Sequence, residues 1–263
     1  MSDFNFYLSQ PHTCGYLVDQ KATTLFIDPY AKLSASSYQN LTDMGFRRSG
    51  NLLYRPHCTA CTACIPVRLN IHEFTLSRSF KRNFNRNADL AMKKNENGFT
   101  KNHFELYSRY LLSRHPQGGM DPKCTDTYHA LLGEDWTSTA LYEFFLHDKL
   151  LAIAITDQLP QGLSSVYTFY DPDYMTRGLG TFAILQQIKF CQKENLDWLY
   201  LGFWNPLSNK MSYKNRFQPL QYFYQSRWHA CPPSIPLQSV EQKPLPEQTN
   251  NQSPLDDVLA QNS

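Results

Sequence analysis

From about Ala140 onward, apolar runs alternate with short turn signals in the pattern typical of β-strands. Residues 141–171 hold two or three runs rich in β-branched and aromatic residues. These runs are separated by His147-Asp148-Lys149 and by Pro160-Gln161-Gly162, both of which suit hairpin turns. The pattern therefore predicts a β-meander in this part of the chain.

After the meander, the apolar period lengthens to that of an α-helix. In the segment Thr181–Asn195, the side chains of Phe182, Leu185 and Ile188 fall on one face of a helix. The apolar run Trp198–Leu201 follows and predicts a buried strand. This half of the chain thus predicts strands, a glycine turn, a helix and a further strand, which is an α+β arrangement.

The first half and the C-terminal tail show different patterns. Residues 1–70 mix short strand-like runs with turn signals and cysteines, whereas residues 71–130 are typical of helices with basic and polar faces. The last residues are crowded with Pro, Gln, Asn and Ser and show no apolar period. We therefore predict a Cys-rich N-terminal domain (1–70), a mainly helical basic segment (71–130), a C-terminal domain (131–231) and a disordered tail (232–263).

Composition narrows the class of protein. Hydrophobic residues make up 41% and aromatic residues 14%, which is typical of a globular chain and not of a disordered one. The N-terminus lacks the basic and apolar regions of a signal peptide, and no stretch approaches the roughly 18 apolar residues of a membrane span. We expect a cytoplasmic protein without a membrane segment, in which the seven cysteines are buried thiols or metal ligands and not disulfides.

Charge is unevenly distributed although the formal net charge is only +2. Between Arg47 and Lys101 there are eleven Lys or Arg residues against three Asp or Glu, a local excess of about +8. Such a field attracts phosphate backbones or acidic substrates. The alternative is a basic face that only contacts solvent.

The junction Arg177-Gly178-Leu179-Gly180 carries the first chemical signal. Here an apolar strand leads into a glycine turn that opens a helix, where unpaired backbone amides can bind an anion. The glycines could instead serve only the turn and close helix packing. A strand, a glycine turn and a helix in this order resemble the core of GCN5-related acetyltransferases (GNAT), so we expect a GNAT-like acyltransferase core in the C-terminal half.

A run of cysteines carries the second signal. Cys58, Cys61 and Cys64 are each separated by two residues, so their sulfurs can turn to one centre. With Cys14 or His57 as a fourth ligand, they would form a tetrahedral zinc site or hold an iron–sulfur cluster. Buried free thiols are the alternative.

Eight ordered motifs together resemble the bacterial aspartate/glutamate leucyltransferases of the N-end rule pathway, relatives of the eukaryotic arginyl-tRNA–protein transferases. The resemblance covers about residues 5–230. The motifs lie at Cys14–Tyr16, Gly45–Gly50, Tyr54–Arg68, Ser77–Arg82, Arg114–Met120, Asp171–Ile188, Tyr200–Trp204 and Lys210–Pro219. The eukaryotic relatives show a CxxC where this chain has Cys14-Gly15-Tyr16-Leu17, so their metal-ligand set does not carry across unchanged.

The resemblance implies that leucine passes from leucyl-tRNA to the N-terminal amine of proteins beginning with Asp or Glu, which marks them for degradation. Because the ester is already activated, the transfer requires no cofactor. The enzyme must place the amine about 3 Å from the ester carbonyl, remove a proton and stabilise the oxyanion. A structural zinc or iron–sulfur cluster would be held by Cys14, Cys58, Cys61 and Cys64.

The same resemblance assigns site residues. An acidic first residue calls for a positive pocket, for which the candidates are four arginines: Arg47, Arg48, Arg78 and Arg82. Arg177, Gly178 and Gly180 would lie against the acceptor end of the tRNA. Tyr213 and Lys214 would assist proton transfer or stabilise the leaving group. Alternatively, Tyr213 only packs against Phe217, one helical turn away.

Three other functions fit parts of the sequence. An arginyl-tRNA–protein transferase would share the motifs, and the choice of leucine depends on the overall resemblance to the shorter bacterial branch. An acetyl-CoA-dependent GNAT acetyltransferase would explain the glycine turn but neither the cysteines nor the basic segment. A metal-stabilised RNA-binding protein would explain the cysteines and the charge but not the acyltransferase-like core.

Overall fold

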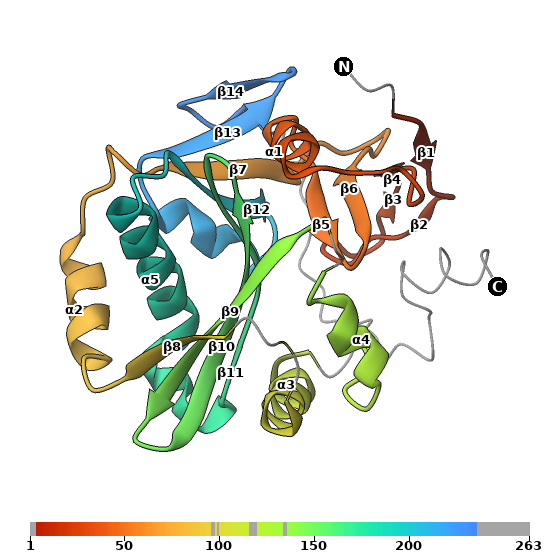
Figure 1. Cartoon of the computed structure of the whole chain (residues 1–263). Coiled ribbons are helices and arrows are strands. Elements are labelled where there is room, and N and C mark those ends of the chain that lie inside the picture. Colours follow the sequence, from red (N-terminus) through yellow and green to blue (C-terminus); the bar gives the residue numbers. More distant parts are fainter. Residues whose placement is uncertain (1–3, 96–97, 99, 116–119, 134–135, 236–263) are drawn as a thin grey trace.

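The structure is a computed structural model that describes residues 4–95, 98, 100–115, 120–133 and 136–235. It contains a large eight-stranded sheet with helices on both faces and a smaller four-stranded sheet beside it (Figure 1). The predicted disordered tail lies, beyond residue 235, outside the described residues. No helix in the described part of the chain is long and apolar enough to cross a membrane.

The elements have the following bounds. The small sheet has the spatial order β1 (Phe6–Leu8), β4 (Thr24–Ile27), β6 (Leu52–Pro56) and β5 (Arg47–Ser49). The large sheet has the order β14 (Arg227–His229), β13 (Leu220–Tyr224), β7 (Ile65–Asn70), β12 (Trp198–Trp204), β11 (Gly162–Tyr170), β10 (Lys149–Leu159), β9 (Ser138–Leu146) and β8 (Ala91–Asn95). A two-stranded sheet joins β2 (His12–Thr13) to β3 (Lys21–Ala22). The helices are α1 (Ala35–Asp43), α2 (Arg78–Arg86), α3 (Lys101–Arg114), α4 (Thr125–Ala130) and α5 (Leu179–Lys193), with 3-10 turns η1 (Pro172–Arg177) and η2 (Ser212–Arg216).

The local predictions for the second half are confirmed. Strands β9, β10 and β11 form an antiparallel meander whose turns lie at the two predicted positions. Helix α5 buries the predicted stripe, including Phe182, Leu185 and Ile188. The predicted strand after the helix is β12, which pairs with β11 in parallel.

The predicted boundary after residue 70 separates strand β7 from most of the sheet to which it belongs. Strand β7 lies inside the large sheet, where it pairs with β12 on one side and β13 on the other. Its alternate residues Ile65, Val67 and Leu69 are buried, so this strand belongs to the C-terminal core. Strand β8 extends the same sheet, so the segment 71–130 is helical only in part.

Helices cover both faces of the large sheet (Figure 1). Helix α5 packs on one face, and α2 lies on the outer side of α5. Helices α3 and α4 pack on the other face, against β9, β10 and β11. Helix α1 fills the space between the two sheets, where Tyr38 and Leu41 contact residues of both. The two sheets therefore share one buried junction.

Candidate functional site

Strands β11 and β12 separate after a short paired stretch. Their ladder ends at Ser164 and Tyr200, although the strands continue to Tyr170 and Trp204. The register of β12 against β7 shifts beside Gly202, whose φ of +74° lies in the left-handed region. A bulge of this kind bends and twists the strand that carries it. The bend leaves the edge of β11 that faces β12 without a partner strand beyond Ser164, whereas β10 still pairs along its other edge.

The side chain of Arg47 occupies this point of separation. Its Nη2 donates to the carbonyl of Val166 and, at 3.5 Å, to that of Ser165. Buried carbonyls that lose their ladder need another donor, and the guanidinium supplies it. A Cβ added to Gly202 would lie only 2.0 Å from Arg47 Nη1. Gly202 is therefore needed both for the positive φ and for the close approach of Arg47.

Four tyrosines lie near enough to Arg47 to be affected by its charge. Burial raises the pKa of Tyr16, Tyr54, Tyr167 and Tyr213, and the Arg47 guanidinium opposes each shift. All four phenols therefore keep their protons at neutral pH and can donate hydrogen bonds. We call Arg47 and these four tyrosines the candidate site.

The predicted catalytic pair lies on η2, where Tyr213 belongs to the candidate site and Lys214 is its neighbour in the chain. Tyr213 keeps 40% of its surface exposed, whereas Lys214 is 7% exposed. The amine of Lys214 donates to the carbonyl of Phe203 at 2.6 Å. Burial, and secondarily the charge of Arg47, lowers the pKa of Lys214 well below its usual value. Lys214 therefore holds η2 against β12, and the catalytic role predicted for it stays a prediction.

Arg48 is not available to a substrate, contrary to the prediction. Its side chain is fully buried, and Nε and Nη2 bind both carboxylate oxygens of Asp157 at 2.6 and 2.8 Å. Its other nitrogen–hydrogen groups donate to two backbone carbonyls. The hydroxyls of Tyr38 and Thr139 also donate to Asp157. Arg48 thus belongs to a closed, buried network. Asp157 is the centre of this network, and the sequence did not predict its role.

The other predicted arginines do not join Arg47 in one pocket. Arg78 and Arg82 are exposed on α2, on the far side of α5 from β5 (Figure 1). Arg177 pairs with Asp89 and donates to the carbonyl of Arg86, so its guanidinium points toward the α2 side. The predicted four-arginine carboxylate pocket is therefore not formed.

The glycine turn before α5 is held by asparagines of α2. Gly178 has a φ of +67°, and Asn83 donates to the carbonyls of Arg177 and Gly178 at 3.1 Å. A Cβ on Gly178 would lie 2.8 Å from the Asn83 amide, whereas one on Gly180 would meet nothing closer than 3.7 Å. Only Gly178 is thus required by the backbone and its surroundings.

Asp171 fixes the end of β11 and was missed by the sequence analysis. Its carboxylate is fully buried, accepts from Arg109 and Lys149, and caps the backbone NH of Asp173. An Asp followed by Pro after an apolar strand is a common start for a turn, and that was the available signal. By fixing the end of β11, Asp171 also fixes the position of Tyr170. Tyr170 lies beside the candidate site, where it contributes to raising the pKa of Tyr213.

The four predicted metal ligands are neighbours. Cys14, Cys58 and Cys61 each act electrostatically on Cys64, and burial raises the pKa of Cys64 to about 12. Within the described ranges, however, no three His, Cys, Asp or Glu side chains are placed as ligands of one ion. The arrangement as it stands does not fit a metal, so the site stays a prediction and no catalytic step below involves one.

We expect Ser replacements to separate metal ligands from free thiols. If Cys58, Cys61 and Cys64 share an ion, each replacement should remove it and destabilise the protein, because metal binding contributes folding free energy. Ser at Cys191 or Cys231 should leave the metal content unchanged. Elemental analysis of anaerobically purified protein makes the measurement, and a folded, active and metal-free wild type would contradict the prediction.

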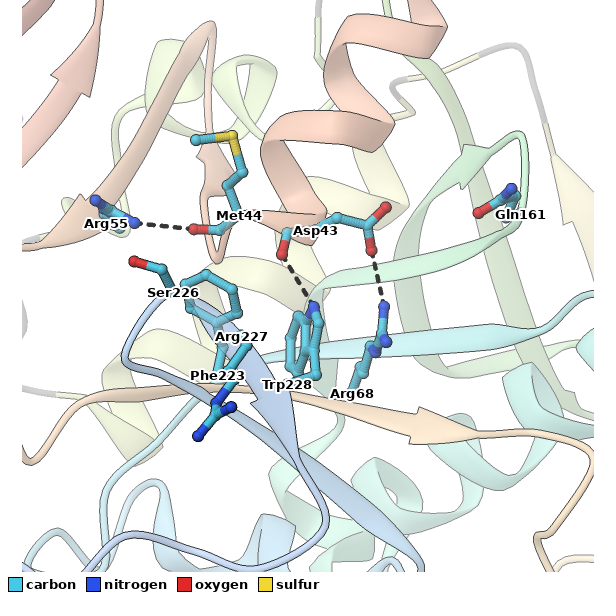
Figure 2. Close-up of a pocket in the computed structure, with 9 residues that line it drawn as sticks. All are labelled: Asp43, Met44, Arg55, Arg68, Gln161, Phe223, Ser226, Arg227 and Trp228. Carbon is cyan, nitrogen blue, oxygen red and sulfur yellow. Dashed lines mark hydrogen bonds and ion pairs between the residues drawn. The ribbon is translucent and has the colours of Figure 1, made fainter.

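A cavity of about 460 Å³ lies between α1 and the β13–β14 hairpin (Figure 2). Several of its polar groups are bonded to one another. Arg68 pairs with Asp43 at 2.8 Å, and Trp228 donates to the backbone carbonyl of Asp43. The Arg68 guanidinium also lies over the rings of Trp198 and Trp228, at 3.5 and 4.3 Å from their centroids. These contacts hold the end of α1 against the large sheet.

The arginine-tRNA-protein transferase family matches the chain in two parts. Its N-terminal part matches residues 12–82 and its C-terminal part residues 102–224. These matches define the class of protein, which is an aminoacyltransferase. The first match ends within α2, and the second begins at the second residue of α3.

Individual relatives narrow this class. An aspartate/glutamate leucyltransferase of Pseudomonas fluorescens (strain Pf0-1) is 44% identical over 228 residues, covering 87% of this chain and 97% of the relative. One of Pseudomonas aeruginosa (strain LESB58) is 44% identical over 230 residues, covering 88% and 98%. The chain therefore belongs to the arginine-tRNA-protein transferase family, among the aspartate/glutamate leucyltransferases, and the predicted family is confirmed.

Solved structures add little to this assignment. The structure of L-PGS from Bacillus licheniformis aligns with a TM-score of 0.41 and 12% identity, covering 79% of this chain and 73% of that one. A likeness at this level does not assign a fold.

Proposed function

We propose that this chain transfers leucine from leucyl-tRNA to the N-terminal amine of proteins that begin with Asp or Glu, in the cytoplasm, and so marks them for degradation. The observation that carries the chemistry is the Arg47 guanidinium placed among protonated phenols where β11 and β12 separate. The names of the two Pseudomonas relatives support the choice of donor and acceptor.

The reaction sets three tasks for these residues. The amine nitrogen of the acceptor attacks the ester carbonyl, so that a C–N bond forms and the ester C–O bond breaks. The attacking ammonium has a pKa of about 8 and must first lose a proton, while the departing ribose hydroxyl must gain one. Negative charge develops on the carbonyl oxygen in between. Since the ester is activated, no cofactor or covalent nucleophile is needed.

Arg47 suits the stabilisation of that charge. A guanidinium has five N–H donors, and the two carbonyls of β11 occupy only Nη2. A preorganised donor of this kind stabilises an oxyanion most where water is excluded. Tyr213 is exposed beside it and is our candidate for proton transfer. Lys214 acts as a positioning residue beneath Tyr213 through its bond to Phe203.

We propose that residues 138–204 form a GNAT-like acyltransferase core. The support is the order β11, glycine turn, α5 and β12, together with a parallel β11–β12 pair that separates after Ser164. The aminoacyl end of the tRNA would lie between the separated strands, beside Gly178 and Gly180. Arg114, at the end of α3, is our candidate for binding the acidic side chain of the acceptor protein. It lies near the candidate site, because both Arg114 and Tyr213 influence the pKa of Tyr110.

We expect radiolabelled leucine to pass from leucyl-tRNA to peptides that begin with Asp or Glu, and not to peptides that begin with Arg or Ala. The physical reason is that a carboxylate is held by a cation, whereas a basic side chain would be repelled. In a parallel assay with arginyl-tRNA, far less arginine than leucine should be transferred to the same peptides. Equal transfer to acidic and basic peptides would contradict the proposed acceptor, and preference for arginyl-tRNA would contradict the proposed donor.

A further inference from the structure

Helix α2 carries three exposed cations on one face. Arg78, Lys81 and Arg82 lie three and four residues apart, so their side chains project from neighbouring turns. Within the described ranges, no carboxylate pairs with any of the three. The face is therefore a concentration of positive charge that the protein itself does not neutralise.

The position of these cations within α2 costs stability. The N-terminal end of a helix carries a partial positive charge, which favours acidic side chains there and disfavours cations. The first turn of α2 contains no acidic residue, and Arg78 is its first residue. The helix dipole and the three side chains thus add to one positive field, an arrangement that favours binding of an external anion over stability of the isolated helix.

The opposite face of α2 fixes the direction of these cations. Phe80 is buried and lies against Phe74 and Phe217. Asn83 is bonded to the glycine turn that opens α5. Because both anchors lie on the inner face, Arg78, Lys81 and Arg82 are held outward.

The same anchors connect this face to the candidate site. The rings of Phe80 and Phe217 stack with centroids 4.8 Å apart. The exposed Arg216 lies over Phe80, at 5.9 Å from its centroid, and is three residues from Tyr213 on η2. Positive charge therefore runs from α2 through Arg216 to the edge of the candidate site.

We propose that the basic face of α2, formed by Arg78, Lys81 and Arg82, binds the phosphate backbone of the tRNA whose aminoacyl end enters the candidate site. This assignment rests on the proposed function. A single carboxylate gains little from an exposed cation in water, whereas a polyanion sums several contacts and releases condensed counterions. An exposed row of cations therefore fits nucleic-acid backbone better than the acidic side chain for which the sequence suggested Arg78 and Arg82.

The test compares tRNA binding by two triple variants as a function of salt. In the first, Arg78, Lys81 and Arg82 are each changed to Gln. In the matched control, three exposed lysines outside the basic segment (Lys32, Lys123 and Lys193) are changed to Gln. The dissociation constant of unacylated tRNA is measured by fluorescence anisotropy between low and moderate KCl, and far-UV circular dichroism checks that both variants are folded.

We expect the α2 variant to bind tRNA roughly fivefold to tenfold more weakly per lost contact at about 0.1 M salt. The slope of the logarithm of the binding constant against the logarithm of the salt concentration should become shallower by about 0.7–0.9 per lost contact. The control should match the wild type. In transfer assays the α2 variant should raise the KM for leucyl-tRNA and not that for an Asp-starting peptide. An unchanged salt slope, or a rise confined to the peptide KM, would overturn the proposal.

Failure of the proposed function gives a different result. A wild type that binds tRNA through α2 but transfers no leucine would contradict leucyl transfer and still support the α2 surface, because binding is measured without transfer.

Discussion

Replacing Arg47 with Met should lower kcat/KM for leucyl transfer by roughly 10²–10³-fold, the range found when one oxyanion donor is removed. The guanidinium is the cation at the candidate site, and it also satisfies the carbonyls that β11 exposes where it leaves β12. Arg47→Lys should restore only part of the activity, because an ammonium cannot bind β11 and the substrate in the fork geometry of a guanidinium. Steady-state kinetics with leucyl-tRNA and an Asp-starting peptide make the measurement.

Two further variants test this role. Gly202→Ala leaves Arg47 in the chain but places a methyl group against its Nη1, so activity should fall to a similar extent. Because alanine is also strained at the positive φ of Gly202, far-UV circular dichroism must show that this variant is folded. Arg55→Gln is the matched control, because Arg55 is also half-buried and donates to a backbone carbonyl, that of Met44, at 3.0 Å. Its activity should stay near that of the wild type. An Arg47→Met variant within about threefold of the wild type would remove Arg47 from the mechanism.

The elements that the sequence predicts well are those whose contacts are local. The meander of β9, β10 and β11 joins neighbouring strands through two short turns, and the apolar stripe of α5 repeats along one helix. Both signals are complete within about thirty residues. Strand β7 differs, because its partners β12 and β13 follow it by more than a hundred residues. No local pattern indicates such a pairing, so the sequence did not assign β7 to the large sheet.

The same limit applies to the predicted site residues. Arg47 and Arg48 are adjacent and chemically identical, yet one lies at the candidate site and the other pairs with Asp157, 109 residues away. In a strand, successive side chains point to opposite faces, so one of any adjacent pair must turn inward. Which one is buried depends on Asp157, and nothing near Arg48 in the sequence indicates it.

Replacing Asp157 with Asn should lower the free energy of unfolding by about 3–5 kcal/mol, the range for breaking a buried ion pair by removing one partner. The Arg48 guanidinium would remain buried opposite a neutral amide, and the hydroxyls of Tyr38 and Thr139 would lose a charged acceptor. This pair joins β5 of the small sheet to β10 of the large sheet, so the substitution should weaken the junction between the two sheets. Urea unfolding at neutral pH makes the measurement.

The matched control is Asp173→Asn, which removes a carboxylate that pairs with Arg109 at 2.9 Å but whose side chain is 70% exposed. An exposed pair contributes about 0–1 kcal/mol, so this variant should be close to the wild type. The double variant Arg48→Met with Asp157→Leu should recover most of the lost stability, because neither charge is then left unpaired in the interior. If Arg48 is structural, this double variant keeps the wild-type KM for Asp-starting peptides. A selective rise in that KM, or a loss at Asp157→Asn no larger than at Asp173→Asn, would return Arg48 to the substrate pocket.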